Sequence, residues 1–328
     1  FSLAAMAGTA LAAPEIVAAT KPVHSLVASV TAGVTEPYLV VKGAASPHTY
    51  SLRPSDAAAL EGADLVFWTG PGFELFLADA LETLAGNAEV VDFSEAEGLT
   101  LLPLREGGAF EAHSHEDETE AEHAAHSHEG HGHDHHEHDH HDHHDHDEEG
   151  HDHHAHEGEA DLHFWLDPQN AILMVNQIEA TLSSADPENA AAYAANAEAT
   201  RQSLDALTAE LTETLAPLAD KPFVVFHDAY QYFENRFGIT LAGTITVSPD
   251  VTPGAARIDE LRTKIAELDA TCVFAEPNFA PSVVNTIIEG TSAKAGTLDP
   301  EGSALTEGPN LYPDLLRSLA AGIIDCLG

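Results

Sequence analysis

Histidine side chains crowd one stretch of this sequence. Only four of the 23 histidines, namely His24, His48, His163 and His227, lie outside residues 113–156, which leaves 19 inside. Aspartate and glutamate fill many of the intervening positions, as in the nine-residue run HDHHEHDHH. Imidazole nitrogens and carboxylate oxygens are ligands for borderline cations such as zinc, copper and nickel. The stretch is therefore predicted to bind metal ions.

Residues 111–160 contain few apolar side chains from which a core could be built. We predict that this tract is disordered without metal and offers many weak, interchangeable sites, including sites for additional Zn²⁺. The alternative is a solvated spacer whose charge keeps the protein soluble. Solubility requires charge but no histidine, so the composition favours metal capture.

Residues 1–13 are apolar and small and contain Ala10-Leu11-Ala12, which has the A-x-A form of a secretory cleavage site. This segment is interpreted as the remnant of a signal peptide, because it is too short to span a bilayer. The mature chain is then expected to begin near Ala13. The sequence thus predicts an exported protein.

The formal net charge of −43 argues against nucleic acid or an anionic membrane as a partner. An excess of carboxylates suits a protein that handles cations. The two cysteines, Cys272 and Cys326, are most simply interpreted as an intrachain disulfide in an exported chain. Their use as metal ligands is the less favoured alternative, because thiols pair in an oxidising compartment.

Short strand-like runs alternate with helical patterns in both halves of the chain, which predicts βαβ units with parallel sheets. With 44% hydrophobic residues, the chain has enough apolar surface for two cores. We predict an N-terminal α/β lobe over residues 14–110 and 161–185, and a C-terminal α/β lobe over 219–328. The strand candidates are residues 16–20, 38–41, 64–68, 90–93, 223–226, 241–245, 272–275 and 295–298.

A long amphipathic helix is predicted between the two lobes, over residues 186–218. Leucines recur at three- and four-residue steps from Leu204 to Leu218, which places them on one helical face. Pro187 stands at the start, and Pro217 is expected to end the helix. A helix of this length in this place is expected to connect the lobes as well as pack on a core.

Three histidines outside the tract are candidates for one shared metal site. His227 directly follows a predicted strand, His48 lies in a turn-rich segment after the second strand, and His163 follows the tract in an aromatic segment. Ligands of open α/β sheets bind beyond the carboxyl ends of the strands, so these residues are predicted to meet between the lobes. His24 also follows a strand, but it is expected to cap the next helix or to support the site from outside.

Four segments carry a resemblance to a known family. The chain resembles the periplasmic zinc-binding proteins of ABC transporters, the ZnuA type of the metal-specific solute-binding proteins, over nearly the whole mature chain. The resemblance implies two Rossmann-like lobes joined by a rigid helix and a metal site in the interlobe cleft. It also implies that His48, His163 and His227 are the ligands, and that a membrane permease is the partner. The segments are SPHTYSLRPSD (46–56), DLHFWLDP (161–168), FHDAY (226–230) and FAEP (274–277).

The same resemblance also implies which metal the site prefers and which residue is the fourth ligand. Manganese-binding relatives tend to carry a carboxylate where this chain has His227, and three imidazoles favour zinc. Some zinc-binding members have glutamate directly before the first histidine, where this chain has Pro47, which cannot coordinate. Asp299 follows a predicted strand at the place where the wider family supplies an aspartate ligand, so it is predicted to be the fourth ligand. Glu276 and water remain alternatives.

The sequence therefore predicts a monomeric periplasmic protein that captures Zn²⁺ and delivers it to an ABC-type importer, and that is not an enzyme. One alternative is a zinc storage or chaperone protein that works mainly through the tract. Another is a zinc hydrolase, because three histidines with an open fourth position can activate water. The sequence shows no flanking general base for hydrolysis. Because ligands must be deprotonated, affinity is expected to fall as the pH drops through about 6.5.

Overall fold

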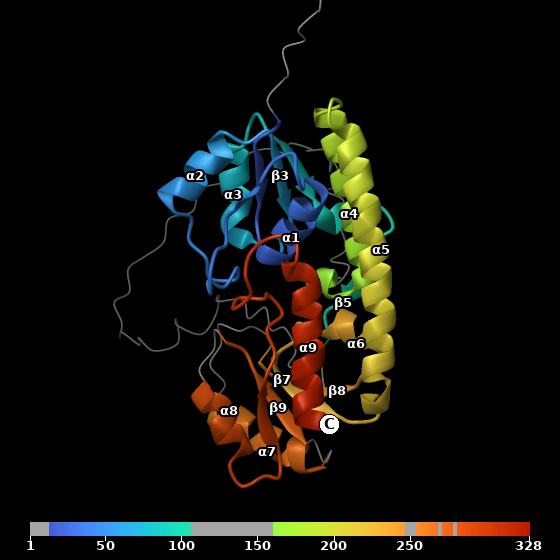
Figure 1. The fold of residues 1–328 in the computed structure, drawn as a ribbon. Coiled ribbons are helices and arrows are strands. Elements are labelled where there is room, and N and C mark those ends of the chain that lie inside the picture. The colour runs from blue at the N-terminus through green and yellow to red at the C-terminus, as the bar shows by residue number, and fades with distance from the viewer. Residues whose placement is uncertain (1–12, 106–159, 247–253, 268–270, 278–280) are drawn as a thin grey trace, which may run out of the picture.

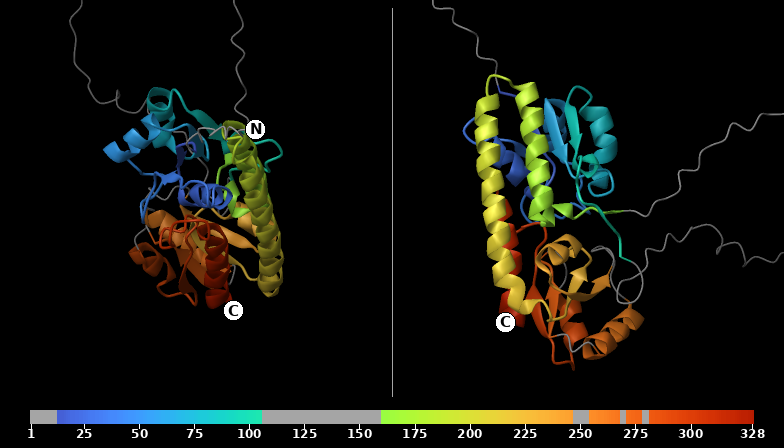
Figure 2. Two further views of the ribbon diagram at one scale, coloured as in Figure 1. Left: turned by 45° about the horizontal axis from the view of Figure 1, so that its top comes forward. Right: turned by 90° about the vertical axis from the view of Figure 1, so that its right-hand side faces the viewer.

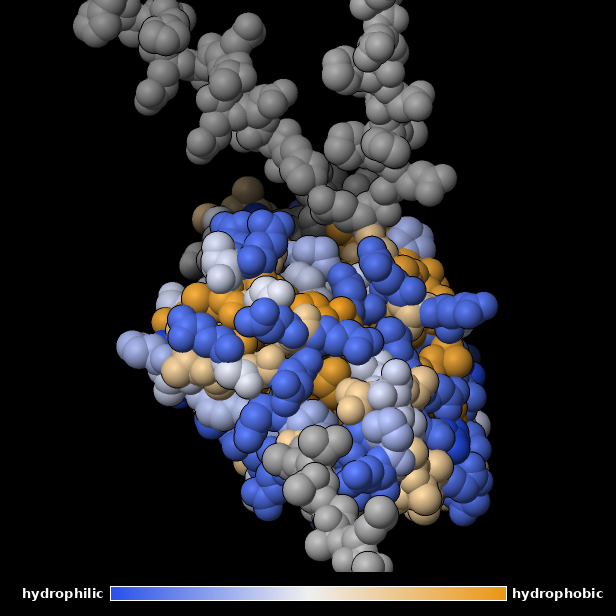
Figure 3. All heavy atoms as spheres, turned by 90° about the horizontal axis from the view of Figure 1, so that it is seen from above, coloured by the Kyte–Doolittle hydropathy of each residue, from blue (hydrophilic) through white to orange (hydrophobic). Residues whose placement is uncertain are grey.

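The fold is described by a computed structural model that covers residues 13–105, 160–246, 254–267, 271–277 and 281–328 (Figure 1). The predictions for the signal-peptide remnant, 1–13, and for the tract, 111–160, therefore lie outside the described residues except at their last positions. In the described part of the chain, every helix is too short or too polar to cross a membrane. The end of the molecule seen in Figure 3 is mostly hydrophilic, with small separate hydrophobic patches.

The N-terminal lobe is built on a four-stranded parallel sheet with the strand order β2-β1-β3-β4. Successive side chains of a strand face opposite sides of the sheet. Val66 and Trp68 accordingly join the core beneath α2 and α3, whereas Leu65 and Phe67 join the larger core that contains α1 and α4. The elements are β1 (Ile16–Ala18), α1 (Lys21–Val30), β2 (Tyr38–Leu39), α2 (Pro54–Glu61), β3 (Leu65–Trp68), α3 (Leu75–Leu84), β4 (Glu89–Asp92) and a 3-10 turn (Phe93–Glu95).

The C-terminal lobe repeats this plan with a parallel sheet of order β10-β9-β7-β8. One face packs on α7 and α8, and the other packs on α5, α6 and α9. The prediction of two parallel-sheet α/β lobes is thus confirmed. The elements are β7 (Phe223–His227), α6 (Gln231–Phe237), β8 (Leu241–Thr246), α7 (Ala255–Glu267), β9 (Cys272–Ala275), α8 (Pro281–Ile288), β10 (Lys294–Thr297) and α9 (Leu311–Leu327).

Helix α5 (Ala190–Leu215) runs alongside both lobes and packs antiparallel on α4 (Pro168–Ala185) (Figures 1 and 2). Its 26 residues correspond to about 39 Å at 1.5 Å per residue. The structure begins this helix at Ala190 rather than at residue 186. Asp186 precedes Pro187 and lies outside the helical region, and its carboxylate accepts a hydrogen bond from the Tyr193 hydroxyl at 2.8 Å. A 3-10 turn (Ala216–Leu218) follows at Pro217, as the proline predicts.

Two further connections hold the lobes together. The segment between β10 and α9 reaches the N-terminal lobe (Figure 1), where the buried Lys21 ammonium donates to the carbonyl oxygens of Gly302 at 3.2 Å and Ser303 at 2.7 Å. At the other connection, the Tyr232 hydroxyl of the C-terminal lobe donates to the carbonyl oxygen of Asp161. Asp161 lies in β6 (Ala160–Asp161), which pairs antiparallel with β5 (Leu102–Pro103) from the other side of the histidine-rich tract. The sequence did not predict either contact.

The predicted disulfide between Cys272 and Cys326 is confirmed. It joins the first residue of β9 to the last turn of α9, with 6.1 Å between the two Cα atoms. Both cysteines are buried in the core of the C-terminal lobe. The alternative role as metal ligands is therefore excluded for this pair.

Candidate metal centre

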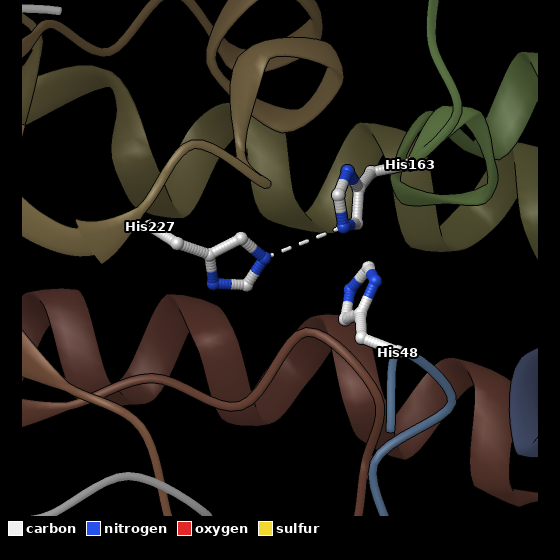
Figure 4. Close-up of side chains that lie close together, drawn as sticks. All are labelled: His48, His163 and His227. Carbon is white, nitrogen blue, oxygen red and sulfur yellow. Dashed lines mark hydrogen bonds between the residues drawn. The ribbon is translucent and has the colours of Figure 1, made fainter. Parts of the chain in front are cut away.

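Three histidine rings meet between the lobes (Figure 4). His48 comes from the loop after β2, His163 from the residues after β6, and His227 from the end of β7. One potential ligand nitrogen from each ring lies within 4.8 Å of the other two. Within the described residues, this is the one group of histidine, cysteine or acidic side chains close enough to share a metal ion. The structure thus brings together the three histidines that the sequence singled out.

The His163 ring is fixed by Asp161, two residues earlier. The carboxylate oxygen Oδ1 of Asp161 lies 2.8 Å from the ring nitrogen Nδ1 and also accepts the backbone N–H of His163 at 3.0 Å. Asp161 is 2% exposed, and the Gln231 amide donates to its second oxygen at 3.3 Å. Because a carboxylate accepts the proton on Nδ1, the other nitrogen, Nε2, carries a free lone pair that faces the centre.

The His227 ring is fixed in the same way by Glu276, which follows β9. The Glu276 oxygen Oε1 forms a short contact with Nδ1 of His227, and both side chains are buried. Burial alone would lower the pKa of His227, but the Glu276 carboxylate, together with the charges of Asp228 and Asp161, outweighs burial and raises that pKa above its ordinary value. Nε2 of His227 points at Nε2 of His163, 3.4 Å away (Figure 4).

This contact between two Nε2 atoms has a chemical consequence. If both Nδ1 atoms donate to carboxylates, one ring must carry a second proton for the Nε2 atoms to form a hydrogen bond. The Glu276 carboxylate raises the pKa of His227, which favours a second proton on this ring. A second proton on His227 would lie on Nε2, the nitrogen that faces His163.

His48 is held differently from the other two rings. Its backbone N–H donates to the Ser46 hydroxyl at 3.3 Å, and its ring lies edge-on to Phe73 at 4.8 Å between centroids. Desolvation, together with the nearby rings of His163 and His227, lowers the pKa of His48 to about 2. His48 is therefore neutral near pH 7 and ready to act as a ligand.

Aromatic side chains surround the histidines on the N-terminal side. The Phe73 ring lies 5.3 Å from the His163 ring and 4.9 Å from the Trp165 ring, centroid to centroid. Trp165 is fully buried, and its indole N–H donates to the Pro300 carbonyl at 3.1 Å. These rings exclude water from one side of the centre, and a drier site strengthens every electrostatic interaction in it.

The structure leaves Asp299 outside the histidine group. Its carboxylate accepts the Ser303 hydroxyl at 2.7 Å and the Glu301 backbone N–H at 3.1 Å, both within the turn that follows β10. Glu276, the other carboxylate considered, contacts His227 and does not join the group. The assignment of Asp299 as fourth ligand remains a prediction.

The expectation for His24 changes in one respect. It lies inside α1 rather than at its start, where Thr20 occupies the N-cap position. Its ring nitrogen Nε2 lies 3.1 Å from the Pro37 carbonyl, and the residue is outside the histidine group, as expected.

The sequence analysis also missed Asp161, although an aspartate two residues before a candidate ligand was the available signal.

A metal centre shared by two parallel-sheet lobes, with one long helix along both, defines a two-lobed metal-binding protein. The family of zinc-uptake complex component A, periplasmic (ZnuA), matches residues 16–326, and the chain belongs to this family. The chain is 54% identical to the high-affinity zinc uptake system protein ZnuA of Brucella abortus (strain 2308), over 99% of this chain and 96% of that protein. It is 43% identical to the protein of that name from Paracoccus denitrificans (strain Pd 1222), over 99% and 97%.

Solved structures of similar proteins show the same fold. A crystal structure of ZnuA superposes with a TM-score of 0.72 at 23% identity, and covers 96% of this chain and 100% of that chain. A mutant of the laminin-binding adhesin from Streptococcus agalactiae gives a TM-score of 0.71 at 23% identity, with the same coverage. The two-lobed architecture is therefore shared among proteins of low sequence identity.

Proposed function

We propose that this protein captures Zn²⁺ in the periplasm and delivers it, as a monomer, to the membrane permease of an ABC importer. The observation that carries the proposal is the group of three imidazoles between the lobes, in a chain that belongs to the ZnuA family. Its relatives at 54% and 43% identity bear the name of a high-affinity zinc uptake protein. Neutral imidazole ligands suit zinc better than manganese.

The ligand set is His48, His163 and His227, with the fourth position filled by Asp299, Glu276 or water. Glu276 already accepts from His227, and Asp299 would have to release the Ser303 hydroxyl and the Glu301 N–H before it could bind. The engagement of Glu276 also argues against hydrolysis, since this carboxylate is not free to act as a general base toward a zinc-bound water. We therefore propose a binding protein rather than an enzyme.

Thermal unfolding with different metals tests this function. One equivalent of Zn²⁺ is expected to raise the melting temperature clearly, because an ion that binds only the folded protein stabilises it by mass action. A hundredfold excess of free Zn²⁺ over the dissociation constant would contribute about 2.7 kcal/mol. Mn²⁺ at the same concentration should raise it less. Equal stabilisation by Mn²⁺ would count against three histidine ligands.

For the tract, we propose that it gathers or buffers zinc for the site between the lobes. Deletion of residues 111–159 is expected to leave one tightly bound Zn²⁺ per chain and to remove the weaker ions, because the described ligands lie outside the tract. Metal analysis and a competition titration on both forms measure this. Loss of the tight ion from a folded deletion protein would instead support the storage or chaperone alternative.

Proton release should accompany zinc binding. The pKa of His227 is raised, so this ring holds a proton on Nε2 up to a pH above 6.5, and zinc must displace that proton. Affinity should thus fall by about tenfold for each unit that the pH drops below the pKa of His227. The pKa of His48, about 2, is too low to contribute. Calorimetry in buffers of different ionisation enthalpy, on protein without residues 111–159, counts the protons, and a pH-independent affinity between pH 6 and 8 would contradict the assignment.

A further inference from the structure

Two of the three histidines are held by buried carboxylates, and the third is not. Asp161 lies 2.8 Å from Nδ1 of His163, and Glu276 contacts Nδ1 of His227. Asp161 and Glu276 are 2% and 5% exposed. The His48 ring instead makes a T-shaped contact with the Phe73 ring.

Each carboxylate is itself fixed by the fold. The backbone of Asp161 pairs with Leu102 in the β5–β6 ladder, and its side chain accepts from Gln231 of α6, so the residue is held by both lobes. Glu276 directly follows β9, whose backbone pairs with both β7 and β10. His227 ends the neighbouring strand β7, and the sheet therefore sets the spacing between Glu276 and its histidine.

The charge of the ion gives these carboxylates a second role. Three neutral imidazoles contribute no charge, so a buried Zn²⁺ would keep two uncompensated positive charges in a site of low dielectric. Asp161 and Glu276 carry two negative charges one ring away from the ion. Carboxylates that accept the second N–H of a ligating histidine both orient the ring and make it a better donor.

On the basis of the proposed zinc site, we propose that Asp161 and Glu276 are positioning residues for it. Each accepts the Nδ1 proton of its histidine, so that Nε2 is the nitrogen offered to the ion, and together they balance the two charges of Zn²⁺. His163 and His227 then form a preset pair, with their Nε2 atoms 3.4 Å apart, and His48 completes the site from the other side.

The test uses the full chain with Asp161→Asn, Glu276→Gln and the matched control Asp186→Asn. The control removes another buried carboxylate, which accepts from Asn189 and Tyr193 at the junction of α4 and α5, away from the histidines. Free zinc is set with a chelator so that only the tightest site fills. Asp161→Asn and Glu276→Gln are each expected to weaken zinc binding by about 10- to 100-fold, and Asp186→Asn is expected to leave it unchanged.

A spectroscopic measurement separates positioning from a general loss of structure. In the Co²⁺-loaded protein, the Nδ1 protons of ligating histidines give paramagnetically shifted NMR signals. We expect two of these signals, from His163 and His227, to exchange slowly with solvent because buried carboxylates hold their protons. Glu276→Gln should speed the exchange of one of them, and Asp161→Asn that of the other. Glu276→Asp keeps the charge but shortens the reach, so its affinity should fall between those of the wild type and Glu276→Gln.

The outcomes distinguish this inference from the function on which it rests. Unchanged affinity and unchanged proton exchange in Asp161→Asn and Glu276→Gln would overturn the positioning role, while tight zinc binding that depends on the histidines would leave the function intact. If Glu276→Gln does not fold, Asp161→Asn and Glu276→Asp decide in its place, and unchanged affinity in both overturns the proposal. Tight zinc binding that survives His163→Ala would overturn the function itself.

Discussion

Replacing His227 with alanine is expected to abolish tight zinc binding. The substitution removes one of the three proposed imidazole ligands. The loss of affinity should exceed the roughly 10- to 100-fold that follows when only an outer partner of a ligand is removed. It also leaves the Glu276 carboxylate, 5% exposed, without the ring to which it is bound. Breaking a buried ion pair by removing one partner typically costs about 3–5 kcal/mol, so the metal-free variant should be less stable as well.

A matched control separates ligand loss from destabilisation. His24 is another buried histidine, with its Nε2 3.1 Å from the Pro37 carbonyl and no place in the metal group. His24→Ala should lower stability and leave zinc affinity unchanged. Competition titration of the folded variants, without residues 111–159, measures both effects. A His227→Ala protein that still binds one zinc tightly would refute the three-histidine site.

The substitution Asp299→Ala tests the fourth ligand of the zinc site in the same way. If Asp299 completes the site, its loss should weaken zinc binding less than the loss of His227, because three imidazoles remain. If water fills the position, affinity should not change, and the turn after β10 should become less stable because Asp299 holds Ser303 and the Glu301 N–H. The size of the change therefore assigns the fourth ligand.

The sequence predicted the site best where a candidate ligand directly follows a recognisable strand. Phe223 to Phe226 form an apolar run that predicts a strand, and the structure places this strand inside the sheet, between β9 and β8. A histidine directly after such a strand lies at the carboxyl edge of the sheet. Because ligands bind beyond the carboxyl ends of parallel strands, the same argument predicted that His48, after the second strand, lies between the lobes. The position of His163 depends on the β5–β6 ladder, which spans the tract and has only two residues in each strand. The sequence offered His163 as a candidate from its place after the tract, and the resemblance to zinc-binding proteins implied its role as a ligand.

Other parts of the site were beyond sequence reasoning for identifiable physical reasons. The hydrogen bond from Lys21 to Gly302 joins residues 281 positions apart, and no local preference encodes it. The Asp299 side chain has two competing positions. An aspartate just before Pro300 can reach into the space between the lobes or bind its own turn, and the local hydrogen bonds prevail in this structure. The sequence offered Glu276 only as an alternative fourth ligand, because its contact with His227 depends on the pairing of β7 with β9.

Loss of the disulfide is the second large effect that we expect. The bond joins Cys272 to Cys326, 54 positions later, and the chain-entropy account gives a contribution of about 4 kcal/mol to the stability of the oxidised protein. A double Cys272→Ala, Cys326→Ala variant should therefore unfold at a clearly lower denaturant concentration than the oxidised wild type. The reduced wild type serves as the reference, because it lacks the bond but keeps both sulfur atoms in the core.

Zinc affinity should respond far less than stability to the missing disulfide. Cys272 begins β9 and Glu276 follows its end, but the backbone pairing of β9 with β7 and β10 sets the position of Glu276 without the bond. The bond instead anchors the last turn of α9 against the sheet, so its loss releases the end of that helix first. Denaturant unfolding and competition titration on the same samples measure the two quantities separately. Coinciding unfolding midpoints for the oxidised and reduced proteins would contradict the stabilising role of the disulfide. A zinc affinity that falls in step with stability would contradict the independence of the metal site from this bond.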